Sequence, residues 1–215
     1  DALLASTVNN SGVIQARTVE NRDGRIILLG GMEAGTTHVA GTLDASALTG
    51  GNGGFIETSA AHVKIADNAR ITTLAANGNN GTWLIDPQDF TIAASGGDMT
   101  GGALSTYLNN SSVTIVSSAG ATAGNGDIFV NDAVNWNANT LTLTAARNID
   151  INAVMTAGGS AGLALNPTTA NGADAAASAT SSTVNIMPGL GRVDFTGSGN
   201  SLRINGTVGG GRVQR

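Results

Sequence analysis

The residues that could perform acid–base or metal chemistry in this chain are few and widely separated. Cys is absent, which excludes a cysteine nucleophile, a cysteine-bound metal and a disulfide framework. The two histidines are His38 and His62, too few for a multi-histidine metal site. A histidine-based catalytic triad is not expected either, and His62, directly before an apolar triplet, is expected at a corner of the fold.

Asp86 and Asp89 flank Pro87 and form the only carboxylate pair that invites a catalytic interpretation. Two carboxylates can hydrolyse a glycosidic bond, one as acid and the other as base or nucleophile. An Asp before Pro is also typical of a turn, where the side chain accepts backbone N–H groups. We expect the turn, and therefore no catalytic residue here.

Gly124, Gly126 and Asp127 partly match the Gly-x-Gly-x-Asp repeat of calcium-binding β-rolls. The Asp comes one position too early, and the repeat period of those proteins does not follow. The sequence therefore predicts no metal site and no cofactor, and we expect that the chain is not an enzyme.

Two aromatic residues could stack on a sugar ring, because aromatic faces pack well against apolar surfaces. Trp136 lies between two Asn residues, and we expect it in the core. Phe129 occupies the outward phase of its apolar–x–apolar triplet, so it is the better candidate of the two for a ligand contact.

The elements that must position these residues are short strands. An apolar–x–apolar triplet recurs along the chain, bounded by Gly, Asn, Ser or Asp, and this alternation indicates half-buried strands. The triplets are 63–65, 83–85, 90–92, 113–115, 128–130, 141–143, 149–151, 163–165, 184–186, 193–195 and 202–204.

The triplets recur at a nearly constant interval, as from Ile128 to Ile149 or from Val63 to Trp83. One structural unit of that length matches one coil of a parallel β-helix. We therefore predict an all-β fold, a parallel β-helix (β-solenoid) of about ten coils of ~21 residues. An antiparallel β-sandwich, which is also rich in short strands, is the alternative.

Composition agrees with a narrow solenoid. Aromatic residues make up 3% and charged residues 12%, with 31 Gly in 215 residues, which excludes a protein of long charged helices. No apolar run is long enough for a membrane helix. The net charge of −5 disfavours nucleic acid as a partner.

Two stretches interrupt the period. Residues 93–112 are expected to be an irregular insertion with a short helix over 103–108. Residues 166–183 have low complexity and are expected to protrude as a loop, either a spacer or a ligand contact through Asn171 and Asp174. The expected organisation is β-helix coils over 1–92 and 113–215 on either side of the insertion.

Several stretches resemble exoproteins of bacterial two-partner secretion, the filamentous-haemagglutinin type of adhesin. The most specific is Gly81-Thr-Trp-Leu-Ile-Asp-Pro-Gln-Asp-Phe-Thr-Ile92, and others are 10–16, 23–29, 41–47, 53–60, 148–152 and 201–207. The family's Asn-Pro-Asn motif is not matched by Asn166-Pro167-Thr168, so we expect an internal fragment whose residues 1–92 resemble the end of the secretion domain.

The resemblance implies a right-handed β-helix exported through an outer-membrane partner pore and displayed at the bacterial surface or released. It implies a shaft for attachment to a host glycan or receptor, or to biofilm matrix polysaccharide, and hence a part in virulence. The alternatives are a polysaccharide-active β-helix enzyme, a stalk for contact-dependent toxin delivery, and an extracellular filament formed by end-to-end self-association.

Overall fold

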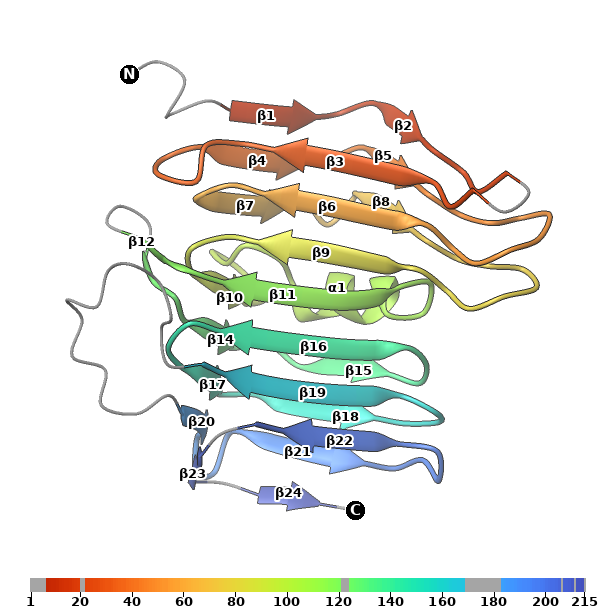
Figure 1. The fold of residues 1–215 in the computed structure, drawn as a ribbon. Coiled ribbons are helices and arrows are strands. Elements are labelled where there is room, and N and C mark those ends of the chain that lie inside the picture. Colours follow the sequence, from red (N-terminus) through yellow and green to blue (C-terminus); the bar gives the residue numbers. More distant parts are fainter. Residues whose placement is uncertain are drawn as a thin grey trace.

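The computed structural model describes residues 7–19, 22–120, 124–168, 183–205, 207–210 and 212–214. The chain winds through stacked levels, and its first and last described strands lie at opposite ends of the stack (Figure 1). Each full level contributes one strand to a long sheet, then one to a second face, then one to a third face. This all-β arrangement of parallel strands in stacked sheets is consistent with a β-solenoid.

The long sheet has seven parallel strands and runs through nearly the whole stack. In chain order these are β3 (Arg25–Leu29), β6 (Phe55–Ser59), β9 (Thr82–Asp86), β11 (Ser112–Ser117), β16 (Thr140–Ala145), β19 (Gly162–Pro167) and β22 (Ser201–Ile204). Alternate side chains are buried, as in β16, because only one side of the sheet faces the core.

The second face consists of two parallel sheets. The first contains β1 (Thr7–Asn10), β4 (Thr36–Val39) and β7 (His62–Ile65), and the next contains β10 (Phe90–Ile92), β14 (Ile128–Val130), β17 (Ile149–Ile151), β20 (Thr183–Ile186) and β23 (Thr207–Gly210). The two sheets are separated where Asp98 and Met99 lie between β7 and β10, accepting from Ile65 N and Ala93 N.

The third face is interrupted by a helix. On one side lie β2 (Val13–Gln15), β5 (Thr42–Asp44) and β8 (Arg70–Thr72), and on the other β15 (Val134–Trp136), β18 (Val154–Ala157), β21 (Arg192–Phe195) and β24 (Arg212–Gln214). Helix α1 (Gly101–Tyr107) contacts both β8 and β15, so it takes the place of a strand. A small antiparallel hairpin, β12 (Ala119–Gly120) with β13 (Gly124–Asn125), projects between β11 and β14.

Helix α1 begins where Thr100 caps it, since the Thr100 hydroxyl accepts the N–H of Ala103 at 3.2 Å. It lies in the segment where a short helix was expected. Its Leu104 and Tyr107 are buried, and the Tyr107 ring meets the Trp83 ring edge-on with centroids 5.2 Å apart. The helix is thereby fixed to the core behind the long sheet. Among the described residues no helix has the length and apolar character needed to cross a membrane.

All eleven apolar–x–apolar triplets lie within strands, so this part of the prediction is confirmed. Their first residues contribute to the core: Trp83, Val113, Leu141 and Leu163 line one inward row of the long sheet, which Ile56 of β6 continues.

The prediction of about ten coils of uniform length is wrong. In the described part of the chain the long sheet has seven strands. Ile128 stacks on Ile149 in the second face, whereas Gly162 stacks on Ser201 in the long sheet, almost twice as far along the sequence. The coils therefore differ in length as well as in number from the expectation.

The physical reason for this error is that spacing alone does not identify a face. Val63 lies in β7 on the second face, whereas Trp83 lies in β9 of the long sheet, so the interval between them is not one coil. Long corners add residues without adding strands. At one corner, the backbones of two coils lie so close together that a Cβ on Gly81 would lie 1.8 Å from the Gly54 carbonyl oxygen.

Candidate functional site

The expected ligand contact Phe129 lies on the outward side of β14. It is half-buried and stands in register between Thr91 and Asp150 on the neighbouring strands. Its contact with a ligand stays a prediction. Asn171 and Asp174, the other two expected contacts, lie outside the described residues.

Trp136 is in the core, as expected, with 1% of its surface exposed. Its Nε1 is buried and has no hydrogen-bond acceptor among the described residues, whereas Nε1 of Trp83 donates to Thr58 Oγ1 at 3.1 Å. Neither indole is available to stack on a sugar.

The histidines form no site in the described part of the chain. His38 Nδ1 lies 3.2 Å from Asn9 Oδ1 on the surface of the second face, and His62 is exposed at the start of β7. Within residues 7–19, 22–120, 124–168 and 183–214, as far as they are described, no three His, Asp or Glu residues are grouped to hold a metal ion.

The carboxylates of Asp86 and Asp89 have separate roles. Asp89 Oδ1 accepts the backbone N–H groups of Gly126 and Asp127, each at 2.8 Å. The expectation that the Asp before Pro87 would accept backbone N–H groups is wrong, because Asp89 does so instead, and its donors belong to the next coil. Asp89 therefore joins two coils rather than closing a local turn.

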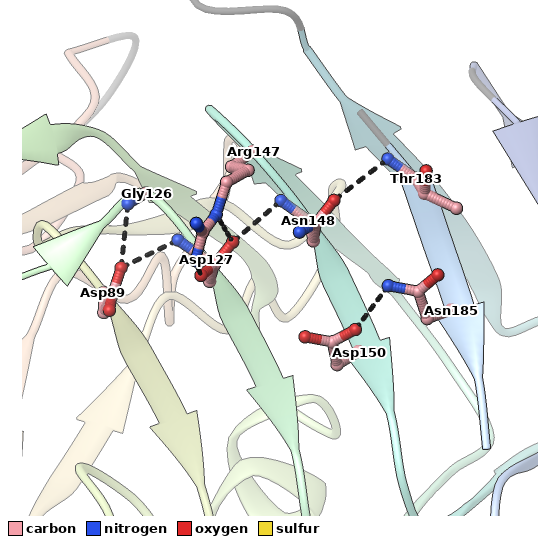
Figure 2. Close-up of polar contacts among 8 residues, drawn as sticks. All are labelled: Asp89, Gly126, Asp127, Arg147, Asn148, Asp150, Thr183 and Asn185. Carbon is pink, nitrogen blue, oxygen red and sulfur yellow. Dashed lines mark hydrogen bonds and ion pairs between the residues drawn. The ribbon is translucent and has the colours of Figure 1, made fainter. Parts of the chain in front are cut away.

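This arrangement is repeated along one corner of the stack, as Figure 2 shows. Asp89, Asp127, Asn148 and Thr183 each stand at the start of a strand of the second face. Asp127 Oδ1 accepts the N–H of Asn148 at 3.0 Å, and Asn148 Oδ1 accepts that of Thr183 at 3.3 Å. We name these four residues the corner ladder. Each of its first three side chains satisfies a backbone donor at the start of the next coil's strand, which is a structural role.

Asp127 also carries an ion pair. Arg147 Nε donates to Asp127 Oδ1 at 2.8 Å, and its Nη2 contacts Asp127 Oδ2 (Figure 2). The hydrogen bonds to Asp127 raise the pKa of Arg147. Both Asp127 carboxylate oxygens are thereby occupied by protein donors. Asp127 in the Gly124–Asp127 segment therefore links two coils through Arg147 and Asn148.

Asp86 has an unusual environment for a carboxylate on an outward strand position. Its Oδ1 is buried and has no hydrogen-bond donor among the described residues. Burial, and next the negative charge of Glu57 on β6, raise the pKa of Asp86 to about 6. Sequence reasoning paired Asp86 with Asp89, whereas the structure couples it electrostatically to Glu57 on the preceding strand of the long sheet.

The feature most suited to hold a ligand is a cleft on the third face, next to α1. It has a volume of about 550 Å³ and lies between β5, the segment 67–72 and the stretch from Thr106 to Asn110. This volume is in the usual range for small-molecule sites. We name it the helix cleft, and it exists because α1 replaces a strand between β8 and β15.

The floor and edges of the helix cleft are polar. Tyr107 is buried beneath it and donates its hydroxyl to the Ala69 carbonyl at 3.1 Å, and burial together with the charge of Asp67 raises its pKa to about 12. Asp44 is held by Arg17, whose Nε donates to Asp44 Oδ2 at 2.7 Å. Although burial opposes it, the bonds from Arg17 and Ser46 lower the Asp44 pKa, so Asp44 is ionised and paired.

None of the helix-cleft residues was predicted from the sequence. They come from β5, β8 and the end of α1, so no local motif contains them. The available signal was the helix within an otherwise regular strand pattern, because a break in a repeat is often where function lies. Comparison with protein-family models, curated proteins and solved structures finds no match to this chain.

Proposed function

We propose that this chain is a shaft segment of a secreted or surface-displayed bacterial adhesin of the filamentous-haemagglutinin type. The observation that supports it best is the seven-stranded parallel sheet, which continues from β3 to β22 with a buried apolar row behind it. A stack of this kind separates what lies at its two ends and presents long side faces to the surroundings.

We infer that the coils wind in a right-handed sense, giving a right-handed parallel β-helix. Strands β9, β11 and β16 are parallel neighbours joined by connections that leave the long sheet and return to it. Such crossover connections are right-handed in nearly all proteins because of the twist of the strands.

The stack is suited to folding after export. In the described part of the chain, each strand of the three faces pairs only with strands of adjacent coils, so a coil can form as soon as the preceding coil is in place. The corner ladder adds a polar link at three successive steps, from Asp89 to Asp127, then to Asn148 and Thr183. A chain without Cys also reaches the outside without premature disulfides. These features favour passage through an outer-membrane partner pore, followed by folding outside the cell.

The role in attachment, to a host-cell glycan or receptor or to matrix polysaccharide, forms part of the proposal. The proposal also treats the chain as a non-enzyme, because the coupled carboxylates Glu57 and Asp86 lie on the outward side of a sheet rather than in the helix cleft. A toxin-delivery stalk and a self-associating filament remain the competing uses of the same shaft.

Export is tested by placing the chain behind the secretion domain of a two-partner exoprotein and co-expressing its pore. We expect protease-resistant chain in the medium. A matched variant with Leu141→Asp places a charge in the core and should be exported poorly or degraded. Wild-type chain that stays in the periplasm, or that emerges unfolded, contradicts the proposal.

Attachment is tested separately by binding of the labelled chain to host cells and to a glycan array. A second version has residues 167–182 shortened to a Gly/Ser link. Saturable binding lost in this version would place the contact in that segment, with Asn171 and Asp174. Binding that survives would place it on the faces of the stack, and no binding by either folded version would leave a shaft without adhesion of its own.

A further inference from the structure

The helix cleft differs from the other polar surfaces of the stack in how its side chains are paired. Elsewhere, several outward amides donate to the preceding coil: Asn185 to Asp150 at 2.6 Å, Asn152 to Asn131 at 2.7 Å and Asn205 to Asn166 at 2.7 Å. These pairs form ladders because the strands stack in register. Such side chains are satisfied by the protein itself.

Around the helix cleft, four polar side chains lack such a partner. The side chains of Thr42, Asn68, Arg70 and Asn110 line it, and none has a hydrogen-bond or ion-pair partner within the described part of the chain. Arg70 stacks on Thr42 in the β5–β8 register, and Asn110 comes from the turn after α1, on the opposite side. Donors and acceptors from two walls therefore meet in one cavity.

The charges of the helix cleft nearly cancel. Asp44 is neutralised by Arg17, which lies beside it, while Asp67 and Arg70 contribute one charge of each sign. Asp67 keeps one oxygen for a ligand, because only its Oδ1 accepts a bond, from the Thr100 hydroxyl at 2.8 Å. A strongly anionic ligand would be repelled by Asp67, and a strongly cationic ligand would be repelled by Arg70.

We propose that the helix cleft binds a short, uncharged saccharide. Carboxylates, guanidinium groups and amides can each form two hydrogen bonds to adjacent hydroxyl groups. A saccharide presents such hydroxyl groups along its length. The cavity of about 550 Å³ opens to solvent, as needed for a segment of a longer glycan. This inference rests on the proposed attachment function and gives it a site that is independent of residues 167–182.

Tyr107 provides a reporter for this site. It is the only Tyr of the chain and it lines the helix cleft, so labelling with 3-fluorotyrosine gives a single ¹⁹F signal there. The probes are maltotriose, lacto-N-tetraose and triacetylchitotriose as uncharged saccharides, and a hyaluronan hexasaccharide as an anionic one. Each is titrated to about 10 mM, which reaches weak millimolar binding.

We expect a saturable ¹⁹F shift with at least one uncharged saccharide and a weaker response to hyaluronan. Arg70→Gln and Asn110→Ala should each weaken the binding about 10-fold or more, the usual effect of removing a hydrogen bond to a charged or buried partner. Arg203→Gln is the matched control, because Arg203 is an exposed arginine on the outward side of β22, in the long sheet, and its substitution should change nothing.

Three results would overturn the inference: no saturable shift with any uncharged saccharide, a shift that Arg70→Gln and Asn110→Ala leave intact, or tighter binding of hyaluronan than of the uncharged probes. These failures are distinct from failure of the shaft proposal. A chain that is exported and folds, yet gives no ¹⁹F response, retains the shaft and loses the saccharide site.

Discussion

Replacing Asp86 by Asn should stabilise the protein at neutral pH and have little effect at pH 4. The Asp86 carboxylate ends β9 with Oδ1 buried and without a donor among the described residues, near the negative charge of Glu57. Its pKa is raised from 3.8 to about 6. Asn has nearly the same shape and carries no charge, so it removes the penalty without opening a cavity.

The sign follows from proton binding. Folded Asp86 holds its proton up to about pH 6, whereas in the unfolded chain the group ionises near 3.8. The folded state therefore binds more protons between these values, and this group lowers the free energy of unfolding as the pH rises through that window. The difference between the two pKa values corresponds to about 3 kcal/mol at most, and solvent screening at this half-buried position reduces it to about 1–2 kcal/mol.

The assay is thermal unfolding of wild type and Asp86→Asn between pH 4 and pH 7.5. For a chain of this size we expect Tm to rise by about 2–8 °C at pH 7.5. Glu57→Gln should give a smaller gain of the same sign, since it removes only the repulsion. Asp23→Asn, at an exposed carboxylate, is the control for loss of one negative charge. A pH-independent difference, or destabilisation by Asp86→Asn at pH 7.5, would refute this reasoning.

Four further substitutions test the links between coils and the core. Asp127→Ala leaves an N–H and the Arg147 guanidinium without their acceptor, so urea unfolding should show a loss of about 2–4 kcal/mol, whereas Arg147→Gln, at a partly exposed group, should cost about 1 kcal/mol or less. Thr58→Val removes the acceptor of the buried Trp83 Nε1 and should cost about 1–3 kcal/mol by the same assay. Gly81→Ala forces two backbones apart and should lower the free energy of unfolding by about 2 kcal/mol or more, with hydrogen exchange rising first at β9. Equal effects of Asp127→Ala and Arg147→Gln would contradict the described ion pair. Unchanged stability of Thr58→Val or of Gly81→Ala would contradict the contacts described at those residues.

The strands were predictable because their signal is local. A triplet such as Leu141–Leu143 alternates inward and outward residues whatever lies next to it, and the structure buries both leucines. The number of coils was not predictable in the same way, because it depends on which strands share a face. Val63 and Trp83 fall on different faces, and no local pattern distinguishes this from one coil.

The candidate site was less predictable for a related reason. Arg70 and Asn110 line one cleft only because α1 occupies the position between β8 and β15, and they are too far apart in the sequence to form a motif. The corner ladder, in contrast, had a readable signal. Asp89, Asp127 and Asn148 each directly precede an apolar triplet, and that repeated position could have predicted a coil-to-coil link.

The large aromatic side chains explain how the helix and the helix cleft are connected. Trp83, Tyr107 and Phe90 belong to the coil that contains α1, and Trp136 belongs to the coil that follows. A helix is about 10 Å wide and cannot approach the opposite sheets as closely as a strand, so this level of the core needs larger residues. The same substitution leaves β8 without a strand beside it on the side of α1, so Arg70 and Asn110 lack the coil-to-coil partners that the ladders have. The composition inside the stack and the unpaired groups outside it therefore have one cause, the substitution of a helix for a strand.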